Sequence, residues 1–270
     1  MQAKPFTLKL PPVAGKPAGH NVITAEGALV VIGANGAGKT RFGFWLEEKN
    51  PTLVHRIAAQ KSLTFPDSVR APAIDEASDA LLWGYKRGSN TATHKHNRWG
   101  SSPTTGLLND YERLVEFLFA EEAERNAEFK RAAKATSDRV EPPETKLDII
   151  KRIWEHTLPE RELIIGGGKV DAKKRHAQTA AFNARHMSDG ERVIFYLIGQ
   201  ALATPANGII VIDEPELHLH RAVQARLWDE IEAERTDCLF VYITHDLDFA
   251  ASRVGAAKIW LREFNGTDWE

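Results

Sequence analysis

The sequence is short of cysteine, of long apolar runs and of any excess of one charge. Its single thiol, Cys238, excludes an internal disulfide and a cysteine zinc site, and it suits a reducing compartment. No apolar run approaches the roughly 18 residues that cross a bilayer, and the N-terminus lacks the apolar core of a signal peptide. We therefore predict a cytoplasmic protein with no membrane partner. The net charge of −2 excludes a global basic field for nucleic acid but leaves local patches open.

Strand-like and helix-like segments alternate at both ends of the chain. Apolar and β-branched runs typical of buried parallel strands lie at 28–33, 208–214, 238–244 and 257–262. Segments with helical spacing separate them, such as VQARLWDEIEAER at 223–235. This alternation predicts an α/β fold around a parallel sheet.

The middle of the chain has a different pattern. Residues 85–106 contain no acidic residue and little apolar content, which indicates an extended loop. Two groups of apolar residues then recur at helical spacing: Leu107, Tyr111, Leu114 and Leu118, and after them Leu147, Ile150, Trp154 and Leu158. We predict one domain, with a core at 1–71 and 187–264 and a helical insertion at about 72–186. The tail after residue 262 holds two aromatic residues, so either the natural chain continues past Glu270 or the tail folds onto its own domain.

The segment GANGAGKT, residues 33–40, follows a predicted strand and opens a predicted helix. Glycines at 33, 36 and 38 allow the backbone to curl so that successive N–H groups point at phosphate oxygens, next to the positive end of the helix dipole. Lys39 places a charge on the β- and γ-phosphates, and the Thr40 hydroxyl is a ligand for Mg²⁺. The predicted ATP-binding residues are Gly33, Asn35, Gly36, Ala37, Gly38, Lys39, Thr40 and Arg41.

A second carboxylate-bearing segment complements this loop. The apolar run IIVI ends in Asp213, at the strand edge where a carboxylate can hold Mg²⁺. Glu214 follows immediately and is suited to orient and deprotonate an attacking water. The two segments together predict a site that binds a nucleotide with Mg²⁺ and activates water.

With these motifs in place, the sequence resembles the ABC-type ATPase superfamily, a P-loop NTPase fold shared by transporter motors and by SMC, RecF and OLD-type ATPases. GANGAGKT and DEP fit its Walker A and Walker B motifs. MSDGER resembles its signature motif, with Ser188 lying 25 positions before Asp213, and YITHD places His245 at its switch histidine. The resemblance implies that Lys39 and Glu214 are catalytic, that His245 senses the γ-phosphate, and that Gln60 is the Q-loop glutamine beside Mg²⁺.

The signature motif of this superfamily acts between subunits. The resemblance implies that Ser188 and Gly190 meet the γ-phosphate held by another subunit, and therefore a homodimer or higher oligomer with ATP at the interface. Taken alone, Ser188 and Glu191 also form an ordinary capping box at the start of a helix.

The segment EPELHLH, 214–220, resembles the E-P-E-x-H-L-H-P segment of OLD- and RecF-like ATPases, with Arg221 in place of the proline. Within that branch the chain is most similar to anti-phage defence ATPases such as the AriA-like ATPase of PARIS, several of which carry a further effector domain. This resemblance implies an ATP-driven switch or scaffold that controls an effector, as a separate protein or a fused C-terminal domain.

Two alternative functions stay open. One is a DNA-binding ATPase of repair or recombination, in which basic residues of the insertion would bind DNA. These residues can equally form a solvated surface. They are Lys86, Arg87, Lys95, Arg98 and the cluster AKKRH at 172–176. A transporter motor subunit is disfavoured, because no membrane-partner surface is evident.

Overall fold

A five-stranded parallel sheet forms the centre of the chain, in the order β10-β3-β9-β8-β4. The computed structural model describes residues 5–15, 21–59, 61–85, 95–100, 102–104, 106–176 and 180–270. The sheet strands are β3 (Ala28–Gly33), β4 (Val54–Ile57), β8 (Ile209–Asp213), β9 (Leu239–Thr244) and β10 (Ala257–Leu261). Every residue of β4, β8 and β9 is buried, as expected for parallel strands covered on both faces. The predicted α/β fold with a parallel sheet is confirmed.

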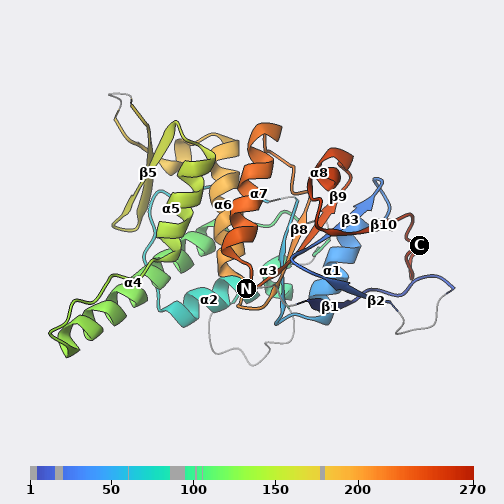
Figure 1. Cartoon of the computed structure of the whole chain (residues 1–270), viewed down its shortest axis with the longest axis horizontal. Helices are drawn as coiled ribbons and strands as arrows, with labels where there is room; N and C mark the ends of the chain where they lie inside the picture. The colour runs from blue at the N-terminus through green and yellow to red at the C-terminus, as the bar shows by residue number, and fades with distance from the viewer. Residues whose placement is uncertain are drawn as a thin grey trace.

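Alternate residues of the strands feed two separate hydrophobic cores, because successive side chains of a strand point to opposite faces. Val211 and Val31 pack with Phe42 and Leu46 of α1 (Lys39–Lys49) on one face. The other face packs against a larger helical layer (Figure 1), to which Ile212 contributes. That layer includes α6 (Asp189–Ala203), α7 (Arg221–Glu234) and α8 (Leu247–Ser252).

The two ends of the described chain meet beside α1. Strands β1 (Phe6–Lys9) and β2 (Val22–Ala25) form an antiparallel pair. The C-terminal tail returns to this pair through a bridge between Val13 and Trp269, and the buried Trp269 indole packs edge-on against Phe42. The aromatic tail therefore folds onto its own domain.

Segment 72–186 holds helices and a second small sheet. Its helices are α2 (Ile74–Trp83), α3 (His96–Trp99), α4 (Tyr111–Ala135) and α5 (Lys146–Thr157), and the last turn before α6 is a short 3₁₀ helix, Ala184–His186. Helix α4 projects away from the rest of the chain at one end (Figure 1), where its residues are charged and exposed. Helices α4 and α5 contribute Leu118 and Trp154 to the same core as the parallel sheet.

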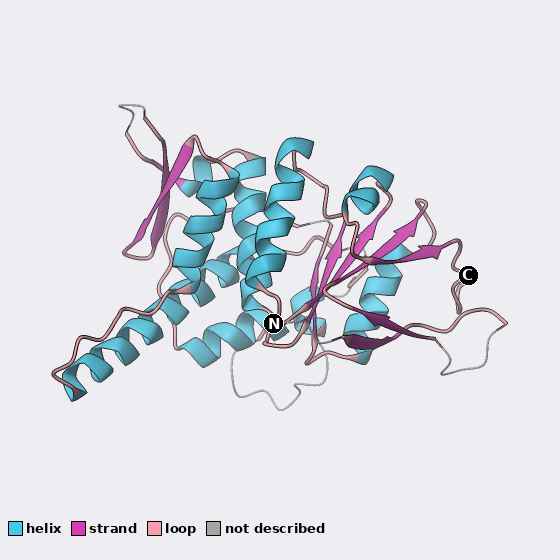
Figure 2. Ribbon diagram, in the orientation of Figure 1, coloured by secondary structure: helices cyan, strands magenta, loops and turns pink. Residues whose placement is uncertain are grey.

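The insertion also contains three antiparallel strands that the sequence analysis did not predict: β5 (Arg161–Gly166), β6 (Lys169–Lys174) and β7 (Phe182–Asn183). Figure 2 shows this sheet at the end of the molecule opposite the parallel sheet. Only Leu163, Val170 and Ala172 of its strands are buried. Apolar and charged residues alternate only around Val170 and Ala172 of β6, which is too short a pattern to mark a strand among charged neighbours. The insertion is therefore mixed rather than purely helical.

The prediction of an extended loop at 85–106, with basic side chains at the surface, is wrong where the structure describes it. Residues 96–99 form α3, and Lys95 and Arg98 are buried. Lys95 Nζ lies 3.3 Å and Arg98 Nη1 3.5 Å from Oε1 of Glu47, a buried residue of α1. A buried carboxylate needs such counter-charges, so these cations face inward. Lys86 and Arg87 lie outside the described residues.

Buried charges continue along this network. Arg98 Nη2 pairs with Asp110 at 3.1 Å, and the Arg56 guanidinium lies 3.7 Å from the Trp99 ring centroid. Burial raises the pKa of Glu47, but the positive charges of Lys95, Arg56 and Arg98 outweigh it and hold that pKa below its ordinary value. None of the helices in the described part of the chain combines the length and apolar character needed to cross a membrane.

Candidate functional site

The glycine-rich loop between β3 and α1 has the backbone shape that phosphate binding requires. Gly36 and Gly38 adopt positive φ angles of 87° and 83°, a region that favours glycine. A Cβ atom at Gly38 would lie 2.6 Å from Cβ of Phe264, and one at Gly33 would lie 2.9 Å from the carbonyl oxygen of Leu261. The loop therefore has room only for glycine at these two positions, and it delivers its backbone N–H groups to the start of α1.

Lys39 is the first residue of α1 and is 7% exposed. Its Nζ atom donates hydrogen bonds to the carbonyl oxygens of Gly33, at 2.9 Å, and Ala34, at 3.1 Å. The same atom lies 3.9 Å from Oε1 of Glu214. The ammonium is thus held at the mouth of the loop, where an anion bound by the backbone N–H groups would meet it.

The remaining predicted loop residues surround this point. Asn35 is exposed in the turn, and the N–H of Ala37 donates to the carbonyl oxygen of Ala34 at 3.1 Å. The exposed Arg41 places its guanidinium 5.2 Å from the ring centroid of Phe264 in the C-terminal tail. Phe264 is a neighbour of the loop that the sequence analysis did not anticipate, because 223 residues separate it from Arg41.

Asp213 ends β8 and is almost completely buried, 2% exposed. Burial raises the pKa of this carboxyl group above its ordinary value, while the Arg56 guanidinium and a hydrogen bond with the Thr40 side chain oppose that rise. Within the described part of the chain its Oδ1 atom has no hydrogen-bond partner. A cavity of about 90 Å³ adjoins it, with Thr40, Arg56 and Trp99 among its lining residues.

The unpartnered Oδ1 atom of Asp213 indicates whether Asp213 and Thr40 fit a metal ion. A buried carboxylate oxygen without a partner is costly, and hard cations such as Mg²⁺ prefer oxygen ligands of the kind that Asp213 and Thr40 offer. The two side chains therefore fit the predicted Mg²⁺ site. Gln60, predicted as a third neighbour of the metal, lies outside the described residues.

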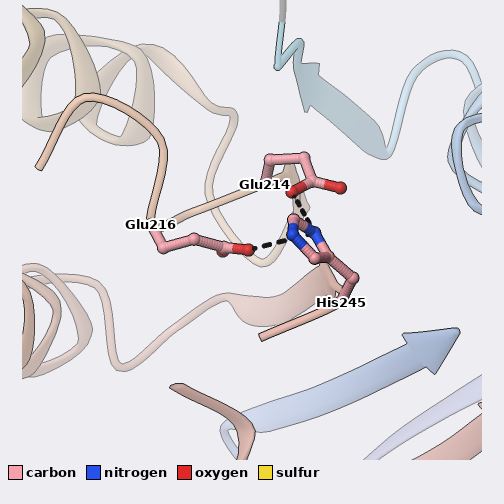
Figure 3. Close-up of side chains that lie close together, drawn as sticks. All are labelled: Glu214, Glu216 and His245. Atoms are coloured by element: carbon pink, nitrogen blue, oxygen red, sulfur yellow. Dashed lines mark ion pairs between the residues drawn. The ribbon is translucent and has the colours of Figure 1, made fainter. Parts of the chain in front are cut away.

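Glu214 and His245 meet although they follow different strands of the sheet (Figure 3). His245 Nδ1 lies 2.6 Å from Oε2 of Glu214. The adjacent strands β8 and β9 deliver them to the same edge, and the N–H of Glu214 donates to the carbonyl oxygen of Ile243 at 2.8 Å. Glu214 has a positive φ of 53°, which is unusual for a residue with a side chain and is the kind of local strain that clusters at active sites.

Glu216 is a third member of this group, and the sequence analysis missed it. Its Oε1 atom accepts a hydrogen bond from the Thr244 hydroxyl at 2.7 Å and lies 3.6 Å from Nδ1 of His245. Burial raises the pKa of Glu216 to about 6, against the lowering effect of the Thr244 hydroxyl. Glu214, Glu216 and His245 each bring one ligand atom within 4.8 Å of the others, which is close enough to share a metal ion. The available signal was the E-P-E repeat, which the sequence analysis used only to assign a branch.

Ser188 lies at the N-cap of α6 and is exposed. The Ser188 hydroxyl donates to Oε2 of Glu191 at 2.7 Å and accepts from the Glu191 N–H at 3.3 Å. Arg161 in turn pairs with Oε1 of Glu191 at 2.6 Å. The predicted capping box is confirmed. Within the described part of the chain, no hydrogen bond or ion pair joins Ser188 or Gly190 to the group formed by Lys39, Asp213, Glu214 and His245.

A comparison with family models finds one match, over residues 73–250, to the family described as "AAA domain, putative AbiEii toxin, Type IV TA system". The match spans more than half of the chain. It begins after the glycine-rich loop and includes the insertion, Ser188, Asp213 and His245. No curated protein matches the chain.

Solved structures similar to the chain include heads of SMC proteins and an ABC-type protein. An SMC head bound to the C-terminal winged-helix domain of ScpA is 16% identical, with 100% of this chain and 96% of that chain covered and a TM-score of 0.49. The SMC head domain from Thermotoga maritima is 15% identical, with 97% and 94% covered and a TM-score of 0.44. A putative ABC transporter ATP-binding protein from Pyrococcus furiosus is 11% identical, with 94% and 95% covered and a TM-score of 0.43. At these values the likeness is loose.

Proposed function

The chain belongs to the AAA-domain family that matches residues 73–250, and from this we propose that it binds and hydrolyses ATP with Mg²⁺ and assembles around the nucleotide. One observation carries the proposal. Asp213 ends β8, Glu214 and His245 directly follow β8 and β9, and Lys39 opens the helix after β3, so these groups meet at the edge of the sheet where three adjacent strands end. These groups supply a phosphate cation, a metal ligand and a base.

The glycine-rich loop and Lys39 would bind the phosphates. The backbone N–H groups of the loop and the start of α1 hold the phosphate oxygens. The Lys39 ammonium donates to two loop carbonyl groups, and it can exchange these neutral acceptors for charged oxygens of the β- and γ-phosphates. A phosphate oxygen carries negative charge and adds a Coulomb attraction to the ammonium that a neutral carbonyl oxygen lacks, so this exchange favours the triphosphate.

Thr40 and Asp213 would hold the Mg²⁺ ion. When bound, the ion neutralises charge on the phosphate oxygens. The chain prepares this site by burying Asp213 beside Arg56, whose positive charge opposes the rise in its pKa and so favours the ionised carboxylate.

Glu214 would act as the general base. Its carboxylate accepts a proton from water, the water oxygen bonds to the γ-phosphorus, and the bond from that phosphorus to the bridging oxygen of ADP breaks. The short contact with His245 orients Glu214 before the reaction. The other ring nitrogen of His245, Nε2, would donate to a γ-phosphate oxygen from the imidazolium form, in which both ring nitrogens carry a proton.

The assembly part of the proposal rests on α6. This helix has 15 residues, and its N-terminus carries an exposed serine and Gly190. A helix N-terminus is a favourable anion site. We propose that Ser188 and Gly190 complete the phosphate site of another copy of the chain, which gives a homodimer or a higher oligomer.

We further propose a biological role as a switch or scaffold that controls an effector in anti-phage defence, in the cytoplasm. Two observations support it: the EPELHLH segment, and the family description, which names a toxin of toxin–antitoxin systems. The effector would be a separate protein or a further domain of the same chain. Two of the basic residues that the DNA-binding alternative would use, Lys95 and Arg98, face Glu47 instead of a DNA backbone.

Two measurements on the same preparation test the proposal. We expect phosphate release from ATP that needs Mg²⁺ and stops with a chelator. We also expect the mass of the assembly to rise when ATP is added to a Glu214→Gln variant. Failure to bind ATP, tested by calorimetry at about millimolar nucleotide, a typical upper range for such substrates, would overturn the proposal.

A further inference from the structure

His245 faces two carboxylates through one nitrogen atom (Figure 3). Nδ1 lies 2.6 Å from Oε2 of Glu214 and 3.6 Å from Oε1 of Glu216. A single N–H group makes one well-aligned hydrogen bond, and a separation of 3.6 Å is too long for one. Glu214 therefore holds the close ion-pair contact in this structure, and Glu216 lies within reach of a small turn of the imidazole.

Glu216 is the fixed member of the three. The Thr244 hydroxyl donates to its Oε1 at 2.7 Å and accepts from the N–H of Asp246 at 2.8 Å, which ties the carboxylate to the end of β9. The Glu216 side chain is 12% exposed, whereas that of His245 is 50% exposed. The imidazole is consequently the group with freedom to turn between the two acceptors.

Glu214 differs from Glu216, because its role as a base requires that water reach one of its oxygens. Its Oε1 lies 3.9 Å from Nζ of Lys39, and its Oε2 lies 2.6 Å from Nδ1 of His245. A carboxylate oxygen can accept more than one hydrogen bond, but a water that approaches Oε2 has to share this oxygen with the imidazole, and a general base must lie within hydrogen-bond reach of that water. Departure of His245 would open this side of Glu214 to water.

We propose that Glu216 is a positioning residue that accepts the Nδ1–H of His245 when nucleotide binds and so frees Oε2 of Glu214 for water. The inference rests on the proposed function, because it names how the same site prepares its base. Thr244 holds Glu216 at the required place, and the turn of His245 passes Nδ1 from one carboxylate to the other without leaving this nitrogen unpaired. Glu216 acts through His245 and touches neither the water nor the phosphates.

A double-mutant cycle on the full chain tests this coupling. Loss of a partner that orients another side chain commonly lowers activity about 10- to 100-fold, so we expect Glu216→Ala, which removes the acceptor, to lower turnover by that factor with the ATP dissociation constant almost unchanged. In a His245→Ala background the same substitution should cost nothing further, because the residue through which it acts is gone. Glu128→Ala, at an exposed glutamate of α4, is the matched control for loss of one carboxylate. Equal turnover of Glu216→Ala and wild type, or additive losses in the double variant, would overturn the proposal.

A second measurement needs no hydrolysis. At about pH 8, where an unperturbed imidazole is neutral, nitrogen-15 NMR distinguishes a proton on Nδ1 from one on Nε2. We expect His245 to keep the proton on Nδ1 in Glu214→Ala, where Glu216 is the acceptor that remains, and to lose this preference in Glu214→Ala/Glu216→Ala. Loss of the preference in Glu214→Ala alone would overturn the inference. Retention of the preference in a chain that hydrolyses no ATP would place the failure in the proposed function instead.

Discussion

Nζ of Lys39 lies 3.9 Å from Oε1 of Glu214, so the cation assigned to the phosphates and the carboxylate assigned to the water already neighbour each other. The two residues are 175 positions apart in the chain, and strands β3 and β8 bring them to one edge of the sheet, separated by β9. The contact places the binding function and the catalytic function in a single charged group. Substitution of each residue separates the binding function from the catalytic function.

Lys39→Ala should weaken ATP binding about 10- to 100-fold, since hydrogen bonds to charged groups contribute about 1.5–3 kcal/mol each. Isothermal titration calorimetry would measure the change. Lys49→Ala provides the matched control, because Lys49 is an exposed lysine at the other end of α1 and should leave affinity unchanged. Equal affinities for the two variants would contradict the assignment of the loop.

Glu214→Gln should leave ATP affinity within about threefold of wild type while turnover falls by a factor on the order of 10² to 10⁴, the usual contribution of a general base. Glutamine keeps the size of the side chain but cannot accept the proton. Steady-state phosphate release and calorimetry on the same sample give both quantities. An unaffected rate would remove Glu214 from the role of base.

Ser188→Arg should abolish most turnover but spare nucleotide binding to the separate subunit. Ser188 is exposed and makes its hydrogen bonds within its own capping box, so the arginine acts at the surface that meets the other copy. Mixing this variant with Lys39→Ala should restore part of the activity, because one of the two composite sites in a mixed dimer would again have an intact loop and an intact α6. Absence of any rescue across mixing ratios would argue against a site shared between subunits.

Glu47→Ala should destabilise the fold by about 3–5 kcal/mol, because removal of one partner leaves buried charges uncompensated. Arg56, Lys95 and Arg98 all face this carboxylate. Urea unfolding followed by circular dichroism would measure the free energy. Glu48→Ala, the adjacent exposed glutamate of the same helix, should change it by less than about 0.5 kcal/mol. Similar values for the two variants would show that the buried ion pairs contribute nothing to the free energy of unfolding.

Glu216 should make stability fall with rising pH. Its folded-state pKa is about 6, raised from 4.5 chiefly by burial, with Thr244 and Glu214 facing it from the same edge. The folded chain therefore binds this proton more tightly than the unfolded chain does. The stability that it contributes is complete below about pH 4.5 and is lost as the pH rises through 6.

The Glu216→Gln variant has no titratable group at this position. A comparison of its stability with that of wild type therefore isolates the effect of the Glu216 carboxyl group. The melting temperature of the variant minus that of wild type should increase between pH 4.5 and 7, as measured by differential scanning calorimetry in matched buffers. A constant difference across that range would show that Glu216 does not titrate there in the folded chain.

The sequence predicted those parts of the site that are formed by residues within a few positions of one another. Three glycines, a lysine and a threonine lie within eight successive residues, 33–40, directly after a β-branched run, so their spacing alone indicates the loop. The apolar run before Asp213 indicates a central strand for the same reason. The capping box at Ser188 was likewise readable, because its hydrogen bonds span three residues.

Long-range contacts set the limits of that prediction. Lys95 and Arg98 were predicted at the surface because their own segment is polar, and only packing against Glu47, some 50 positions earlier, shows that they are buried. Strands β5 to β7 were missed because this small half-exposed sheet buries only Leu163, Val170 and Ala172 of its strands, so the alternation in the sequence is short. Phe264 and Trp269 reach the loop from the far end of the chain.

The sequence by itself determined the glycine-rich loop, the strand-end carboxylates and the α/β class, since each depends on residues within a few positions of one another. Only the tertiary structure decided that His245 meets Glu214, that Glu216 lies beside them, and that Asp213 keeps an unpartnered oxygen. The physical reason is the order of strands in the sheet. Adjacent parallel strands β8 and β9 bring residues 31 positions apart to the same edge, and neither spacing nor composition specifies which side chains then come within hydrogen-bond distance.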